Sequence, residues 1–100
     1  MYKVVLADDE QMIRRGLESL PWAEHGMKVV AVAKDGIEAQ EIIDSMEFDL
    51  LITDIKMPGI TGVELAKSLH QTNADTRTIL LSGYGEFTYA RQALGILSLI

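Results

Sequence analysis

The sequence predicts an α/β fold in which helices cover both faces of a doubly wound parallel sheet. Short apolar runs of strand length alternate with longer segments in which apolar residues recur at helical spacing. Gly, Pro, Asp and Ser residues typical of turns separate the two kinds of segment. Strands that alternate with helices form right-handed βαβ units, and consecutive units of this kind build a parallel sheet.

Composition and charge are those of a globular domain and exclude several functions. One hundred residues suffice for one domain, and 48% apolar with 24% charged residues is an ordinary balance. The net charge of −6 argues against direct binding of nucleic acid, and the absence of cysteine excludes disulfides and thiolate metal sites. The sequence has neither a signal peptide nor an apolar stretch of membrane-spanning length. We therefore expect a cytoplasmic protein that does not contact a membrane.

The first half of the chain predicts two strands and two helices. Tyr2–Ala7 and Met27–Ala33 are nearly all apolar and rich in β-branched residues, as expected for strands buried on both faces. A helix is expected at Gln11–Leu20, and a second at Ile37–Met46 after a turn at Asp35-Gly36. The apolar residues at helical spacing are Met12, Ile13, Leu17 and Leu20 in the first helix, and Ala39, Ile42, Ile43 and Met46 in the second.

The second half repeats this alternation. Strands are expected at Phe48–Thr53 and Thr76–Leu81, and the run Gly95–Ile100 could form a fifth. Helices are expected from Thr61 or Gly62 to about His70, and at Phe87–Leu94, whereas a fifth helix is missing. The predicted architecture is a flavodoxin-like sheet with strand order 2-1-3-4-5, which places the first and third strands side by side.

Carboxylates follow both of these neighbouring strands. Asp8 and Asp9 follow the first strand, and Asp54 follows the third, so they should converge at the switch point of the sheet. Three carboxylates close together repel one another unless a cation is present, and an all-oxygen site of this kind suits Mg²⁺. A bound metal also makes Asp54 a plausible acceptor in phosphoryl transfer.

The spacing alone leaves simpler interpretations open. Asp54 could cap the next helix, although that helix is expected to start several residues later. The three carboxylates could form only a solvated acidic rim. Ser82, at the end of the fourth strand, could hydrogen-bond a phosphoryl oxygen or be an ordinary loop hydroxyl.

Four motifs occur together and in a fixed order. They are Val5-Leu6-Ala7-Asp8-Asp9-Glu10, the segment 49–59 that contains Thr53-Asp54-Ile55-Lys56-Met57-Pro58-Gly59, then Gly62, and Leu80-Leu81-Ser82-Gly83-Tyr84. Each motif alone is a weak signal, but the combination is highly specific. Over roughly residues 2–94, the chain therefore resembles the receiver domain of bacterial two-component response regulators.

The resemblance implies a role for five residues. Asp54 matches the phosphoacceptor, which takes a phosphoryl group from a phosphohistidine of a sensor histidine kinase. Asp9 matches the direct Mg²⁺ ligand, Asp8 the residue that holds metal-bound water, and the backbone carbonyl of Lys56 a further ligand beside Asp54. Ser82 matches the switch hydroxyl that moves toward the phosphoryl group. The implied function is signal transduction by a single receiver domain, residues 1–100, and not turnover catalysis.

Two further segments narrow the resemblance. Pro21-Trp22 with Gly26, and Leu81–Phe87 followed by Tyr89-Ala90, are similar to receivers attached to AraC-type helix-turn-helix DNA-binding domains. This similarity implies a parent transcriptional regulator whose output domain is not part of these 100 residues. Core packing is the expected role of Trp22 itself.

The chain departs from the family near its C-terminus. Family members carry a lysine, followed by proline, at the end of strand five, whereas this chain has no lysine after Lys67. Losing that charge-assisted contact predicts a weakened conformational switch. Without a fifth helix, one sheet face should be bare, which invites self-association, for instance as a homodimer swapped through Leu94–Ile100.

Three other functions compete with a phosphoacceptor module. A degenerate or truncated receiver would act only through metal binding and self-association, as the missing lysine allows. A haloacid-dehalogenase-like phosphohydrolase would need a second Asp two residues after Asp54, where Lys56 stands. A flavodoxin-like cofactor binder would need a Gly-, Ser- and Thr-rich loop after the first strand, where Asp8-Asp9-Glu10 would repel a phosphate.

Overall fold

A parallel sheet forms the centre of the molecule. The computed structural model describes residues 1–73, 75–81 and 98–99. Their strands form one sheet in the order β2-β1-β3-β4-β5, with every neighbouring pair parallel, which confirms the predicted topology. The strands are β1 (Tyr2–Ala7), β2 (Met27–Ala33), β3 (Leu50–Asp54), β4 (Arg77–Leu81) and β5 (Ser98–Leu99).

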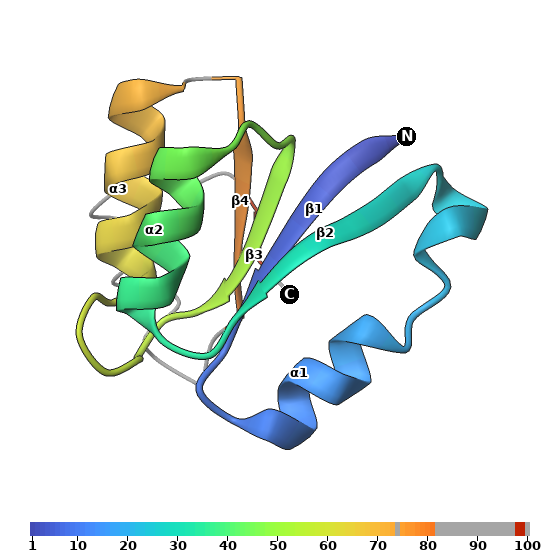
Figure 1. The fold of residues 1–100 in the computed structure, drawn as a ribbon, viewed down its shortest axis with the longest axis horizontal. Helices are drawn as coiled ribbons and strands as arrows, with labels where there is room; N and C mark the ends of the chain where they lie inside the picture. Colours follow the sequence, from blue (N-terminus) through green and yellow to red (C-terminus); the bar gives the residue numbers. More distant parts are fainter. Residues whose placement is uncertain (74, 82–97, 100) are drawn as a thin grey trace.

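Helices lie on both faces of this sheet. The helices α2 and α3 lie side by side over one face, while α1 lies on the other side of β1 and β2 (Figure 1). Their bounds are α1 (Gln11–Glu18), α2 (Gly36–Ser45) and α3 (Gly62–Thr72), and a short 3₁₀ helix, Trp22–His25, precedes β2. The helix predicted at Phe87–Leu94 lies outside the described residues. None of the described helices is long and apolar enough to cross a membrane.

Alternate residues of β1 supply the cores on the two faces. Val5 and Ala7 pack toward α2 and α3, against Ala39, Leu65 and Leu69, and all five are at most 3% exposed. The partly buried residues around this core include Ile42, Ile43 and Met46, as the predicted stripe of α2 requires. Burial on both faces therefore explains why the strand reads as a continuous apolar run.

The other sheet face is covered over β1 and the middle of β3, so the predicted bare face is absent there, while its part over β5 is not tested. Val4 and Leu6 are fully buried and Ile52 is 2% exposed. Leu17 and Trp22 pack against this core, and the indole Nε1 of Trp22 donates to the carbonyl of Leu17 at 2.8 Å. The core-packing role of Trp22 is thus confirmed.

The apolar stripe predicted on the first helix is mostly exposed. The helix ends at Glu18 instead of Leu20, and none of its eight residues is buried. Met12 is 84% exposed, Ile13 42% and Leu20 49%, while only Leu17 packs against the sheet. The periodicity identified a helix correctly, but α1 contacts the sheet too sparsely to bury the whole stripe.

Two strands begin later than predicted. β3 starts at Leu50 and β4 at Arg77, because the residues before them pair outside the regular ladder. The backbone N–H of Asp49 donates to the Lys3 carbonyl at 2.9 Å, and the hydroxyl of Thr76 donates to the Phe48 carbonyl at 3.0 Å. Both segments are fixed to their neighbours without being strand residues.

Candidate metal centre

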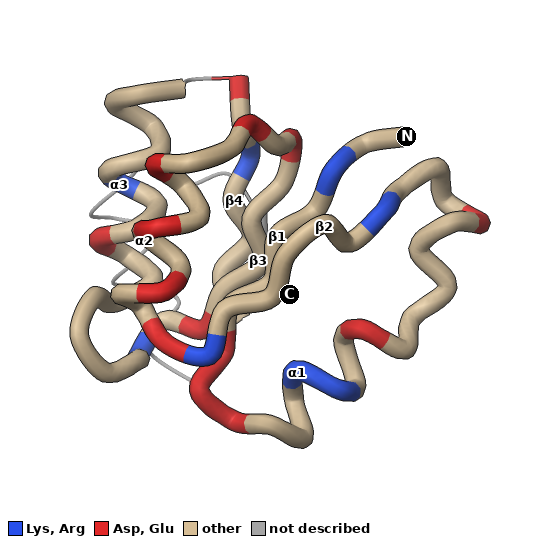
Figure 2. The backbone as a smooth tube through the Cα atoms, viewed as in Figure 1, with Lys and Arg blue, Asp and Glu red and all other residues tan. Residues whose placement is uncertain are grey.

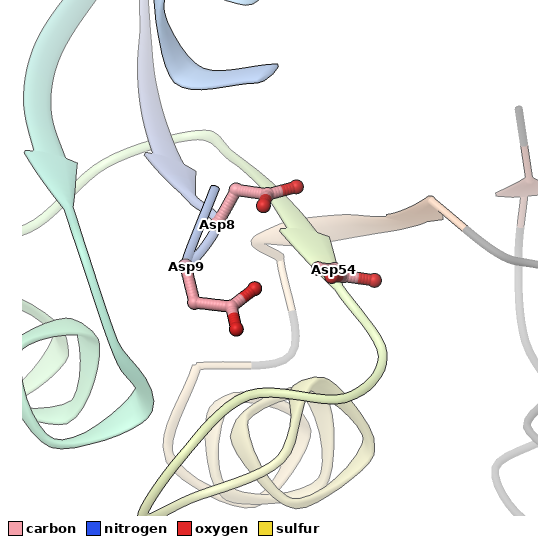
Figure 3. A group of neighbouring side chains, drawn as sticks. All are labelled: Asp8, Asp9 and Asp54. Atoms are coloured by element: carbon pink, nitrogen blue, oxygen red, sulfur yellow. The ribbon is translucent and has the colours of Figure 1, made fainter. Parts of the chain in front are cut away.

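The ends of β1 and β3 bring three carboxylates together. Ala7 pairs with Thr53 in the parallel register, so Asp8, which follows β1, and Asp54, the last residue of β3, lie at the same edge of the sheet. Figure 3 shows the side chains of Asp8 and Asp9 extending toward the side on which Asp54 lies. One carboxylate oxygen from each of the three lies within 4.8 Å of the others. The predicted convergence of Asp8, Asp9 and Asp54 is therefore confirmed.

Asp8 is the most firmly held of the three. Its side chain is 3% exposed. Its backbone N–H donates to the Ala33 carbonyl at the end of β2, at 3.2 Å, and its Oδ1 accepts from the Glu10 N–H at 2.9 Å. Asp9 is exposed and Asp54 is half-buried. The site is thus anchored at its buried end and open to solvent at the other.

Arg14 forms a contact that the sequence did not predict. Its Nη1 donates to the carbonyl of Asp8 at 2.7 Å, although Arg14 lies outside the apolar stripe of the helix. In Figure 2 the basic segment of α1 follows the acidic turn that leaves β1. The sequence did contain a signal for this contact. It is a basic residue in the first turn of a helix that directly follows an acidic turn.

The loop after β3 is held by side-chain and backbone hydrogen bonds. Oδ1 of Asp54 accepts from the N–H of Ile55 at 2.8 Å, and the Thr53 hydroxyl donates to the Asp54 carbonyl at 2.9 Å. The N–H of Gly62 donates to the carbonyl of Ile55 at 2.8 Å, which ties the first residue of α3 to the end of β3. Asp54 is thus oriented by its own strand end.

Asp54 does not cap the following helix. Thr61 is the N-cap of α3: its hydroxyl accepts from the Glu64 N–H at 3.2 Å, and the Glu64 carboxylate accepts from the Thr61 N–H at 3.1 Å. The Glu64 carboxylate accepts from the Thr61 N–H and, at 3.0 Å, from the Thr61 hydroxyl, and these two bonds hold the pKa of Glu64 below its usual range. The capping interpretation of Asp54 is wrong, because a complete capping box already satisfies the start of the helix.

The donor set fits a hard divalent cation. Burial raises the pKa of Asp8, and the neighbouring Asp9 carboxylate also raises it, while the Glu10 N–H and the Arg14 guanidinium oppose the rise. Because the charged form of Asp8 is destabilised, a bound cation would stabilise the cluster by neutralising its charge. Oxygen ligands from two strands, partly open to water, are typical of Mg²⁺ sites.

Without metal, the protein should become less stable, relative to an Asp8→Asn variant, as the pH rises through the raised pKa of Asp8. The folded state binds the Asp8 proton more tightly than the unfolded chain, so this contribution is full below the ordinary value of 3.8 and is lost above the raised one. Asn retains the Oδ1 acceptor but does not ionise. Urea unfolding of both proteins in chelator, from acid to neutral pH, measures the difference. A difference in free energy of unfolding that does not change with pH would contradict the expectation.

Two further residues were predicted for the site. Lys56 is exposed in the loop two residues after Asp54. Asp54 pairs with Leu81 in the ladder between β3 and β4, but Ser82, the next residue, lies outside the described residues. The roles of both remain predictions.

Comparison with known proteins gives a consistent family. The family model described as "Response regulator receiver domain" matches residues 4–97. The uncharacterized transcriptional regulatory protein YesN of Bacillus subtilis is 41% identical over 95 residues, which are 94% of this chain and 26% of that protein. The chain therefore spans about a quarter of the length of this curated relative.

Solved structures agree with the sequence matches. A two component transcriptional regulator AraC from Clostridium phytofermentans is 27% identical, with a TM-score of 0.90 over 100% of this chain and 80% of that one. The response regulator protein TrrA from Thermotoga maritima, solved in complex with Mg²⁺-BeF, is 31% identical, with a TM-score of 0.82 over 100% of this chain and 85% of that one. Both resemble this chain across its whole fold.

Proposed function

Because this chain belongs to the response regulator receiver domain family of two-component systems, we propose that it is a phosphoacceptor module whose Asp54 takes a phosphoryl group from a sensor histidine kinase. The observation that carries the proposal is the convergence of three carboxylates from two strands within 4.8 Å. A chain could belong to the family without having all three carboxylates in place. Phosphoryl transfer needs a metal-binding cluster of this kind beside the acceptor.

Asp8, Asp9, Asp54 and the backbone carbonyl of Lys56 are proposed to hold Mg²⁺. The carboxylate oxygens supply the hard ligands, and the relative TrrA was solved with Mg²⁺-BeF. When bound, the metal neutralises charge on the carboxylates and on the incoming phosphoryl group. Asp8 is buried and accepts hydrogen bonds at its Oδ1 and at its carbonyl oxygen, so we propose it as the most rigid residue of the site. Asp9 is exposed and lies on the solvent side of the site.

The transfer step follows from the orientation of Asp54. The Ile55 N–H holds Oδ1, so the plane of the carboxylate is fixed before the reaction. A carboxylate oxygen attacks phosphorus, and an O–P bond forms while the N–P bond of the kinase phosphohistidine breaks. The imidazole nitrogen keeps the electron pair and takes up a proton. The product is an acyl phosphate on Asp54 and an unmodified histidine on the kinase.

The output is proposed to lie in a second domain of the parent protein. YesN is named a transcriptional regulatory protein, and one structural relative is a two component transcriptional regulator AraC. We therefore propose an AraC-type DNA-binding domain as the partner of residues 1–100, with Ser82 as the switch hydroxyl. In this role the receiver catalyses only its own phosphorylation and dephosphorylation, in the cytoplasm.

The sequence also favours a second candidate function. Residues 68–100 contain no lysine, so this segment does not itself supply the charge-assisted contact to the phosphoryl group that the family's lysine makes. A degenerate receiver that binds metal and partners without switching is consistent with this observation.

The test is the intact mass of the protein after incubation with Mg²⁺ and acetyl phosphate. We expect a gain of one phosphoryl group that requires Mg²⁺ and disappears in excess chelator. A folded protein, verified by circular dichroism, that gains no mass would overturn the phosphoacceptor proposal and favour the degenerate receiver.

A further inference from the structure

The carbonyl oxygen of Asp8 is held by a charged side chain from the following helix. Arg14 Nη1 donates to this oxygen at 2.7 Å, and the Arg14 side chain is half-buried. The backbone N–H of the same residue donates to the Glu10 carbonyl at 3.0 Å, which forms the first hydrogen bond of α1. Residue 14 therefore ties the acidic turn to α1 twice, once through its side chain and once through its backbone.

The contact falls on the peptide group that joins Asp8 to Asp9. A peptide group is planar, so fixing its carbonyl oxygen also fixes the direction of the N–H of Asp9 and the course of the chain there. The Asp8 N–H is bound to Ala33 and its Oδ1 to the Glu10 N–H. The Arg14 contact is the third constraint on this turn, and it is the one that acts on the link to the exposed Asp9.

We propose that Arg14 is a positioning residue for the metal site, which holds the Asp8–Asp9 peptide so that both carboxylates face Asp54. This inference rests on the proposed Mg²⁺ site. Arg14 does not touch the metal in this proposal and acts only through the turn. Groups that orient ligands from outside the first coordination layer are a common requirement of metal sites.

Charge and positioning predict opposite effects of removing Arg14. A cation beside an acidic site repels Mg²⁺, so loss of its charge alone would tighten Mg²⁺ binding. Loss of the hydrogen bond to the Asp8 carbonyl would release the turn and weaken binding. The direction of the change in affinity therefore separates the two roles.

The test is the Mg²⁺ dissociation constant of Arg14→Met, measured by isothermal titration calorimetry without a phosphodonor. Met keeps an unbranched apolar stem and removes the donor. Arg15→Met is the matched control, because Arg15 is the next residue of α1, carries the same charge and is exposed. We expect Arg14→Met to bind Mg²⁺ about tenfold or more weakly than wild type, and Arg15→Met to bind at least as tightly as wild type.

Each outcome has a defined meaning. Arg14→Met binding Mg²⁺ as tightly as Arg15→Met would overturn the positioning role while leaving the metal site intact. Wild-type protein that does not bind Mg²⁺ would overturn the proposed function itself. If Arg14→Met does not fold, Arg14→Lys, which keeps the charge with a shorter donor, is compared with Arg15→Lys. Weaker binding by the Arg14 variant supports the inference, and equal binding overturns it.

Discussion

Replacement of Asp54 by Asn is expected to abolish the Mg²⁺-dependent gain of a phosphoryl group from acetyl phosphate. The amide oxygen of Asn is a far weaker nucleophile than a carboxylate oxygen and would not form a stable acyl phosphate. Asn can keep the hydrogen bond that Oδ1 of Asp54 accepts from the Ile55 N–H at 2.8 Å. The fold should survive, so the loss can be assigned to chemistry and not to unfolding.

Asp44→Asn is the matched control for this experiment. Asp44 is an exposed residue of α2 whose Oδ1 accepts from the Gln40 side chain at 3.0 Å. The control should gain the same mass as wild type, with the modified peptide containing Asp54. A phosphoryl group found on the Asp54→Asn protein by intact mass and peptide mapping would show that another residue accepts it.

The position of the acidic site was predictable because it depends on strand order. Apolar runs located β1 and β2 with the observed bounds, since a strand buried on both faces has a continuous signal. Once β1 and β3 are parallel neighbours, the residues at their carboxyl ends must lie at one edge of the sheet. Asp8, Asp9 and Asp54 then lie together whatever the details of packing.

Other features were not predictable because they depend on contacts between elements. Periodicity showed that Met12 and Ile13 share a helix, but it could not show that α1 leaves them exposed. Arg14 was a plausible surface residue, and only the path of the chain after Asp8 brings its guanidinium to the Asp8 carbonyl. Gly62 was part of a motif, with no indication of what its missing side chain permits.

Replacement of Gly62 by Ala is expected to destabilise the protein strongly. A Cβ at this position would fall on the carbonyl oxygen of Asp54 and lie 3.1 Å from the Cα of Ile55. Both are backbone atoms, one in the last residue of β3 and one in the residue after it, so no side chain can rotate to relieve the overlap. The start of α3 and the strand end must move apart, which would also break the hydrogen bond from the Gly62 N–H to the Ile55 carbonyl.

This separation would affect stability and metal binding together. Overpacking costs about 1–3 kcal/mol and occasionally more, and backbone atoms that cannot rotate away place this overlap at the upper end, against roughly 5–15 kcal/mol that stabilises a typical domain. Any protein that still folds should bind Mg²⁺ more weakly, because moving the backbone carbonyl of Asp54 also moves the carboxylate of the same residue.

Gly16→Ala is the control, because a Cβ there meets no atom within 4 Å, and Ala in a helix should stabilise by about 0.5–1 kcal/mol. Urea unfolding and calorimetry on both variants test the argument. Equal free energies of unfolding for Gly62→Ala and Gly16→Ala would contradict the argument. They would show that β3 and α3 can move apart without loss of stability, and that close packing at Gly62 does not hold Asp54 in place.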